Sequence, residues 1–252
     1  MVQPQAVLDV FLRYEQNVLL VDKKNLYKTV EAAVENNCLT LLIFSCLATV
    51  RNKEELVLDF FQTLFFDGGH KKRLSHAATR AFQLVQEVEN LGLSVKVVPI
   101  LVDTEPIRTW GWTISQEEVT LACELMIEEA NDSGLLPKNW QPILLSDLEA
   151  LCTGNCTFSN CLDWANGAGK HTIAIQEQER HLAKFADRYE FPLGLRKTAT
   201  RQVAAYALEG AILEELFPDA LLLQSEWPWA EKDKLYQWFR KKPLQIVHPF
   251  QK

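Results

Sequence analysis

The chain has 252 residues, of which 48% are hydrophobic and 23% are charged, so it can bury a sizeable core. Its formal net charge of −7 is not typical of a nucleic-acid-binding protein, which usually carries a basic face, but it leaves room for a local basic patch. No apolar stretch approaches the ~20 residues that span a bilayer, and the first residues lack the pattern of a signal peptide. We therefore expect a cytoplasmic protein without a membrane or DNA partner, whose six cysteines are reduced thiols.

The pattern of apolar residues predicts strands that alternate with helices along the chain. Continuous apolar runs are typical of strands that are buried on both faces. Ser115 and Glu118 have the spacing of a capping box at the start of a helix. In chain order, the predicted elements are a strand over 39–45, helices over 54–66 and 75–92, a strand over 94–104, a helix over 114–132, a short strand turning into a helix over 141–151, helices over 175–191 and 198–216, a strand over 220–227, a helix over 230–242 and a strand over 244–250.

This alternation favours an α/β protein with a mainly parallel sheet flanked by helices, because parallel neighbours need a crossover connection. The sequence shows no internal repeat, no low-complexity tract and no linker long enough to separate two domains. We therefore expect a single domain over residues 1–252.

Residues 152–172 are rich in Cys, Asn, Gly and Thr and are expected to form a loop. Three of them are Cys152, Cys156 and Cys161, and His171 or Cys123 could complete a set of four zinc ligands. The spacing of these cysteines is irregular, so we predict free thiols and no metal. The sequence contains neither a complete phosphate-binding loop nor a glycine-rich dinucleotide motif, and we expect no cofactor.

Polar residues end several of the predicted strands, at the edge of a parallel sheet where ligands bind. Ser45 ends the first strand, and Asp103 and Thr104 end the second. Tyr206 and Glu209 are three residues apart on a predicted helix and therefore lie on one face of it. A hydroxyl, carboxylates and a phenol would suit acyl transfer onto serine. The same residues could instead have structural roles, as a strand end, a helix cap or a packed tyrosine.

The order of these features resembles that of the tRNA-dependent cyclodipeptide synthases. "LLIFS", which ends at Ser45, is similar to the family's first motif, an apolar strand with a nucleophilic serine. "ILVDT" is similar to the end of its next strand, and "YALEG" to its helix with a tyrosine and a glutamate. The resemblance implies a Rossmann-like fold and an aminoacyltransferase of secondary metabolism. Such an enzyme joins the amino acids of two charged tRNAs into a cyclic dipeptide without ATP.

By this resemblance, Ser45 would accept the first aminoacyl group as an ester. Glu209 would hold the amino group, and Tyr206 would assist proton transfer. The substrate pocket would be completed by residues that follow two strands, namely Asp103, Thr104, Glu226, Trp227 and Pro228.

The tRNA-binding helix of that family is rich in arginine, whereas the segment 117–132 of this chain is acidic. The basic residues left to bind aminoacyl-tRNA flank the start of the helix that carries Tyr206. These residues are Arg188, Arg196, Lys197 and Arg201.

Two other functions stay open. The segment "FPDALLLQSEWP" resembles a carboxy-terminal stretch of isonitrile synthases, which convert an amino acid with a sugar phosphate. A non-catalytic α/β binding protein is the third possibility. A basic surface near Arg196 and Arg201 would favour tRNA, an acidic-rimmed pocket would favour a small amino substrate, and no pocket at Ser45 would favour the binding protein.

Overall fold

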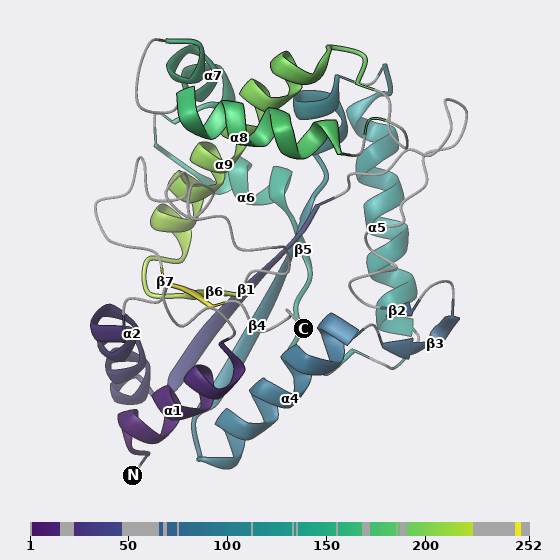
Figure 1. The fold of residues 1–252 in the computed structure, drawn as a ribbon. Helices are drawn as coiled ribbons and strands as arrows, with labels where there is room; N and C mark the ends of the chain where they lie inside the picture. Colours follow the sequence, from purple (N-terminus) through teal and green to yellow (C-terminus); the bar gives the residue numbers. More distant parts are fainter. Residues whose placement is uncertain are drawn as a thin grey trace.

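The computed structural model describes residues 2–15, 23–46, 66–67, 70–74, 76–111, 113–132, 134, 136–154, 156–167, 172–184, 186, 191–223 and 245–247. Five of its strands form one sheet in which every neighbouring pair is parallel, and helices flank both faces (Figure 1). The predicted Rossmann-like α/β fold is therefore confirmed. In spatial order the strands are β5 (Ile143–Leu144), β4 (Ser94–Val102), β1 (Cys38–Cys46), β6 (Leu221–Leu223) and β7 (Gln245–Val247).

The order of the strands places a switch point at the centre of this sheet. The chain starts with β1, adds β4 and then β5 on one side, and returns to add β6 and β7 on the other side. Numbered along the chain within this sheet, the order is 3-2-1-4-5, as in doubly wound dinucleotide-binding sheets. The connections leave β1 and β6 in opposite directions, and in such sheets ligands bind at the carboxyl ends of these two strands.

Side chains of the central strands alternate between two cores, as expected for strands buried on both faces. In β1, Leu41 and Ile43 belong to the first core, and Leu42 and Phe44 belong to the second. The helices of the first core are α1 (Pro4–Tyr14), α2 (Lys23–Glu35), α4 (His76–Asn90) and α5 (Gln116–Asp132). The helices of the second core are α6 (Leu145–Leu151), α7 (Phe158–Asn166), α8 (Thr172–Ala183) and α9 (Leu195–Leu216).

Several predicted helices are confirmed with small shifts in their ends, as α4, α5, α6 and α9. The capping box of α5 is present: the Ser115 N–H donates to Glu118 Oε2, and the Glu118 N–H donates to Ser115 Oγ, both at 3.1 Å. The helix predicted over 175–191 is α8, which begins at Thr172 and ends at Ala183. Helices α1 and α2 are not among the elements that the pattern predicted. Among the described residues, none of the helices is both long enough and apolar enough to cross a bilayer.

The loop prediction for residues 152–172 is wrong, because this segment contains α7. Thr157 caps the helix, and its Oγ1 accepts a hydrogen bond from the Asn160 N–H at 3.2 Å. Cys161 and Ala165 then lie four residues apart on one buried face. That face packs against α9, so tertiary packing stabilises a helix whose composition is typical of a loop.

Other predictions fall partly or wholly outside the described residues. The helix predicted over 54–66 does so except for Phe66, which begins β2 (Phe66–Asp67). This short strand pairs antiparallel with β3 (His70–Leu74), outside the main sheet. The strands predicted over 220–227 and 244–250 are described only as β6 and β7, and the helix predicted over 230–242 is not described.

Candidate active site at the carboxyl edge of the sheet

Ser45 lies at the switch point of the sheet. Its backbone pairs with Leu101 of β4 near the end of β1. Two residues earlier, Ile43 pairs with Leu223, the last residue of β6. The ends of β1 and β6 are therefore neighbours in the sheet. Ser45 lies near the end of β1, and the segment with Glu226, Trp227 and Pro228 follows β6 in the sequence. The Ser45 side chain and that segment lie outside the described residues, so their contacts stay predictions.

Asp103 follows β4, and its side chain is fully buried. Its carboxylate accepts hydrogen bonds from the Ser146 N–H at 3.0 Å, from Ser146 Oγ at 2.6 Å, from Thr120 Oγ1 at 3.2 Å and from Gln116 Nε2 at 3.2 Å. These donors belong to α5 and α6, so the carboxylate ties both helices to the end of β4. Thr104 is also buried, at 4% exposure. Contact of these two residues with a substrate stays a prediction.

Tyr206 and Glu209 are both buried on α9, which packs on the second face of the sheet. Gln202 is buried four residues before Tyr206, and these three residues therefore form one stripe along the helix. This stripe buries a phenol and a carboxylate along one face of α9. Their approach to Ser45 stays a prediction.

A buried chain of polar side chains, absent from the sequence predictions, joins α9 to the end of β4. Gln202 Nε2 donates to Glu105 Oε1 at 3.3 Å, and Gln178 Nε2 of α8 donates to Gln202 Oε1. All three residues are at most 5% exposed. Two features of the sequence could have revealed these hydrogen-bonded side chains: Glu105 directly follows the Asp103-Thr104 pair, and Gln202 lies one turn before Tyr206. The contact between them depends on the packing of α9 against the segment after β4.

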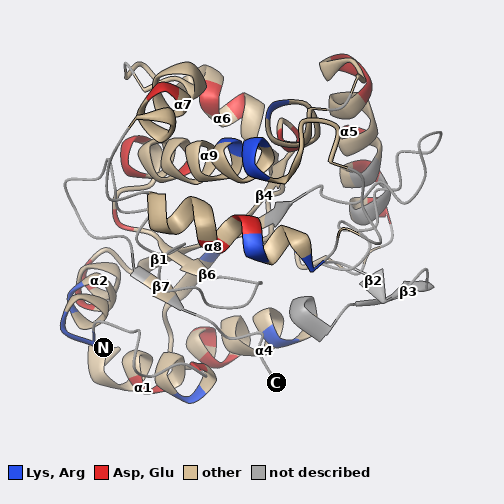
Figure 2. Ribbon diagram, turned by 45° about the horizontal axis from the view of Figure 1, so that its top comes forward, with Lys and Arg blue, Asp and Glu red and all other residues tan. Residues whose placement is uncertain are grey.

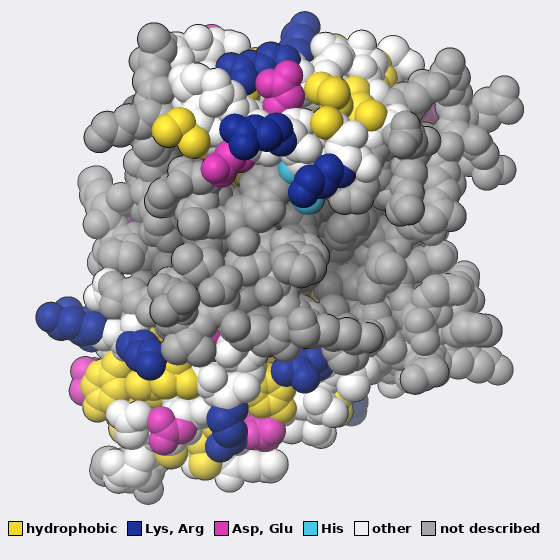
Figure 3. All heavy atoms as spheres, viewed as in Figure 1, with side chains coloured by type: hydrophobic (Ala, Val, Ile, Leu, Met, Phe, Trp, Pro, Cys, Tyr) yellow, Lys and Arg dark blue, Asp and Glu magenta, His cyan; other side chains and the backbone are white. Residues whose placement is uncertain are grey.

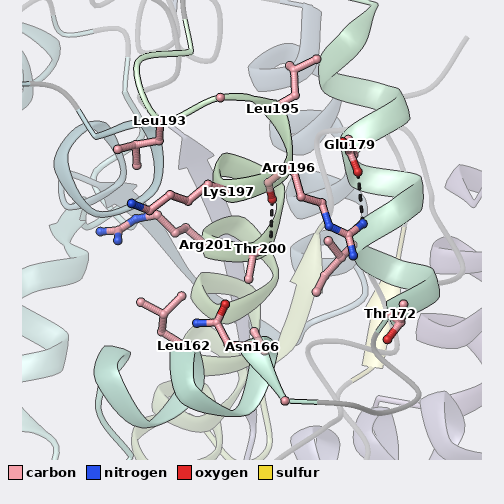
Figure 4. Close-up of a pocket in the computed structure, with 14 residues that line it drawn as sticks. Leu162, Asn166, Thr172, Glu179, Leu193, Leu195, Arg196, Lys197, Thr200 and Arg201 are labelled. Atoms are coloured by element: carbon pink, nitrogen blue, oxygen red, sulfur yellow. Dashed lines mark hydrogen bonds and ion pairs between the residues drawn. The ribbon is translucent and has the colours of Figure 1, made fainter.

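A cavity of about 710 Å³ opens between α7, α8 and the start of α9 (Figure 4). Lys197 and Arg201 lie one turn apart on α9 and extend in the same direction along its wall. Arg196 extends the other way, to an ion pair with Glu179 at 3.1 Å. The wall is therefore basic and partly apolar; its residues are Leu162, Ala165, Asn166, Gly167, Thr172, Ile175, Glu179, Leu193, Gly194, Leu195, Arg196, Lys197, Thr200 and Arg201.

Arg201 connects this cavity to the edge of the sheet. Its Nε donates to the backbone oxygen of Arg108, in the π-helical turn Pro106–Trp110 that follows β4. Its guanidinium lies over the ring of Phe158, with 5.3 Å between the carbon Cζ and the ring centroid. Arg108 lies over the same ring at 5.8 Å and pairs with Glu149 at 2.5 Å. These contacts hold the Arg201 guanidinium in place, and burial lowers its pKa without removing its charge.

Basic side chains are present at this end of the molecule. Figure 2 shows Lys and Arg on α8 and at the start of α9, whereas α5 carries mainly acidic residues. In Figure 3, dark blue side chains lie at the top of the face shown, beside hydrophobic ones. Three of the four basic residues expected to bind tRNA, Arg196, Lys197 and Arg201, thus line one cavity. Arg188 lies outside the described residues.

No family model and no curated protein sequence matches this chain. Among solved structures it matches the PvcA protein from Pseudomonas aeruginosa with a TM-score of 0.59 and 14% identity, over 98% of this chain and 83% of that one. The chain is similar in fold to PvcA. It also matches a cyclodipeptide synthase from Candidatus Glomeribacter gigasporarum, bound to Phe-tRNAPhe, with a TM-score of 0.49 and 10% identity, over 88% of this chain and 93% of that one. The similarity to PvcA concerns the course of the backbone and thereby supports the Rossmann-like fold.

The three cysteines around the start of α7 are free thiols in the structure. Within the described residues, no group of three or more His, Cys, Asp or Glu side chains is arranged to hold a metal ion. We predict that purified protein contains no stoichiometric zinc, because no described side chain completes a ligand set around Cys156 and Cys161. His171, the other candidate ligand, lies outside the described residues. Elemental analysis of the full-length protein measures this. One zinc per chain, lost in Cys156→Ser, would contradict the prediction.

Proposed function

We propose that this chain is an aminoacyltransferase that takes amino acids from charged tRNA and joins two of them into a cyclic dipeptide, as the sequence resemblance to cyclodipeptide synthases implies. The observation that carries the proposal is the cavity lined by Arg196, Lys197 and Arg201. Of these residues, Arg201 also contacts the segment after β4. A basic wall beside the carboxyl edge of the sheet suits the phosphates of a tRNA acceptor end. A cytoplasmic location and a role in secondary metabolism belong to the same proposal.

In this mechanism the Ser45 hydroxyl attacks the ester carbonyl of the first aminoacyl-tRNA. A Ser45 ester forms, the ester bond to the tRNA breaks, and the tRNA hydroxyl leaves with the proton. Glu209 pairs with the ammonium group of the amino acid, and the Tyr206 phenol assists proton transfer. The amine of a second aminoacyl-tRNA then attacks the Ser45 ester, so a peptide bond forms, the Ser45 hydroxyl is released and the dipeptide remains on the second tRNA. Ring closure by the remaining amine releases the second tRNA and the product.

The ester bond of the donor already supplies the activation, so this reaction needs no ATP. The contribution of the protein is mainly to orient the two esters, and such orientation can lower a barrier by ~7–11 kcal/mol. The start of α9 supports binding of the donor, because the Gly194 cap has no side chain to satisfy the first N–H groups of this helix. These groups and the basic side chains of the same turn favour a phosphate.

Charged tRNA and mass spectrometry test the proposed function directly. Purified protein is incubated separately with tRNAs that carry each radiolabelled amino acid. We expect label on the protein and a cyclic dipeptide in solution for at least one of them, and neither with free amino acid. A complete lack of label and of product with every charged tRNA would overturn the proposal.

Reversing one charge in the cavity wall should weaken tRNA binding. Lys197 is exposed and lines the cavity. For Lys197→Glu we expect roughly tenfold weaker binding of charged tRNA at low salt and a shallower dependence on salt, because one phosphate contact is lost. Filter binding at several salt concentrations measures both.

The matched control for this variant is Lys138→Glu, which makes the same charge change on an exposed residue beside Asn139, whose side chain bonds to Val95 near the amino end of β4. Binding by this control should stay close to that of the unchanged protein. Equal losses in both variants would mean that only net charge matters and that the cavity is not the binding site.

A second candidate function is a transferase that uses an amino acid with a small anionic co-substrate, as the resemblance to isonitrile synthases implies. The size of the cavity favours it, since about 710 Å³ lies in the range of pockets for small ligands. A rise in melting temperature with a sugar phosphate but not with charged tRNA would favour this second candidate.

A further inference from the structure

Two thiols touch at the start of α7, outside the cavity wall. Cys156 Sγ and Cys161 Sγ are 3.4 Å apart. Thr157 is the helix cap, so Cys156 directly precedes the cap and Cys161 is the fourth residue of the helix. Residues at these two positions meet across the first turn, as in a hydrophobic staple. The turn is held by hydrogen bonds from the Cys161 N–H to the Thr157 oxygen at 3.0 Å and from the Asn160 N–H to Thr157 Oγ1 at 3.2 Å.

The two thiols have different surroundings. Cys161 is fully buried, whereas Cys156 is partly exposed. The hydrogen bond between the two thiols lowers the pKa of Cys156 to about 7. The same contact and burial raise the pKa of Cys161. A reactive thiolate that solvent reaches, with a second thiol behind it, is the arrangement found in redox-sensitive pairs.

We propose that Cys156 and Cys161 are an oxidation site that closes to a disulfide when a peroxide or a small-molecule disulfide reaches Cys156. With glutathione disulfide, the Cys156 thiolate attacks one sulfur and releases one glutathione thiolate. The Cys161 sulfur then attacks the Cys156 sulfur, loses its proton to solvent and releases the second glutathione. Two electrons pass from the protein to the oxidant. The two sulfurs need to approach by only about 1.4 Å, from 3.4 Å to the length of a disulfide bond.

The disulfide would tie the first turn of α7 to the segment before it. The residues of this helix that line the cavity are Leu162, directly after Cys161, and then Ala165 and Asn166 about one turn further. Oxidation would therefore fix the start of one cavity wall. The experiment below reads the thiols alone, so its outcome is independent of the proposed function.

The reduced protein is treated with glutathione disulfide at pH 7, then unfolded in denaturant so that buried thiols react, and alkylated. We expect six alkylated cysteines before oxidation and four afterwards, because the disulfide consumes two of the six cysteines in the chain. Cleavage after Phe158 separates Cys156 from Cys161, so mass spectrometry identifies a linked pair of peptides. A thiol reductant should restore all six.

Three variants decide which thiols react. Cys156→Ser should show five alkylated cysteines and no linked pair. Cys161→Ala should retain glutathione on Cys156, because no second thiol is there to release it. In Cys161→Ala the pH midpoint for alkylation of Cys156 should rise from about 7 toward the ordinary value of a thiol, because the hydrogen bond with the second thiol is gone. Cys152→Ser is the matched control and should still form the disulfide. Six alkylated cysteines after oxidation, or a linked pair that contains Cys152, would overturn the proposal.

Discussion

Replacing Ser45 with alanine should abolish transfer of labelled amino acid from charged tRNA to the protein. The loss should reach at least ~10³-fold, because the variant has no hydroxyl to form the ester intermediate. Loss of one hydroxyl usually costs on the order of 1 kcal/mol of stability, so the variant should fold. Ser45→Cys should retain some label as a thioester, since a thiolate also accepts acyl groups. Acid precipitation of labelled protein, with circular dichroism for the fold, measures these results.

Two controls separate the Ser45 hydroxyl from other effects on the site. Cys46→Ala removes the thiol next to Ser45 and should leave the label in place. Ser94→Ala makes the same change at the opposite, amino end of β4, where Ser94 is exposed, and should also leave it in place. Label that persists undiminished in Ser45→Ala would eliminate Ser45 as the nucleophile, and label lost in Cys46→Ala would move that role to the thiol.

Replacing Asp103 with alanine should lower the free energy of unfolding by about 3 kcal/mol. The side chain is fully buried and accepts hydrogen bonds from Ser146, Thr120 and Gln116, so its removal leaves several donors without an acceptor. The same bonds tie α5 and α6 to the end of β4. For a chain of this size, such a loss should lower the melting temperature by roughly 10 °C. Urea and thermal unfolding measure the two quantities.

Asp163→Ala is the matched control, because Asp163 is exposed on α7. This variant should change the free energy of unfolding by less than ~0.5 kcal/mol. Asp103→Asn keeps one acceptor oxygen and should fall between the two alanine variants. A loss below about 1 kcal/mol for Asp103→Ala would show that the hydrogen bonds of this carboxylate contribute little to stability. Asp103→Asn, where it folds, also tests the predicted contact with substrate through its KM.

Arg201 is held in place before any ligand binds to the basic wall of the cavity. A flexible surface arginine loses side-chain freedom when it binds a phosphate, whereas Arg201 is already held by the Arg108 oxygen and the Phe158 ring. Lys197, one turn earlier, is exposed to solvent and lines the same cavity. The two side chains would therefore contribute differently, with Arg201 positioning a phosphate and Lys197 attracting it.

The sequence by itself determined which segments form the central strands and most of the helices. Apolar runs such as Leu39–Ser45 and the capping box of Ser115 act over a few residues, so local pattern is enough to predict them. It also placed Ser45 near the end of β1, because the change from apolar residues to a polar one is visible in the sequence itself. The contact of Cys156 with Cys161 could have been found in the same way, had Thr157 been recognised as a helix cap.

Only the tertiary structure decided the order of the strands, and with it the switch point beside Ser45, because that order depends on pairing between residues far apart in the chain. It also decided that α7 is a helix, since the packing of its buried face on α9 outweighs a loop-like composition. The hydrogen bonds of Asp103 and the chain from Glu105 to Gln202 join residues on different elements. The basic cavity likewise needs three helices to form its walls. Local pattern carries no information about such partners, because they are chosen by packing.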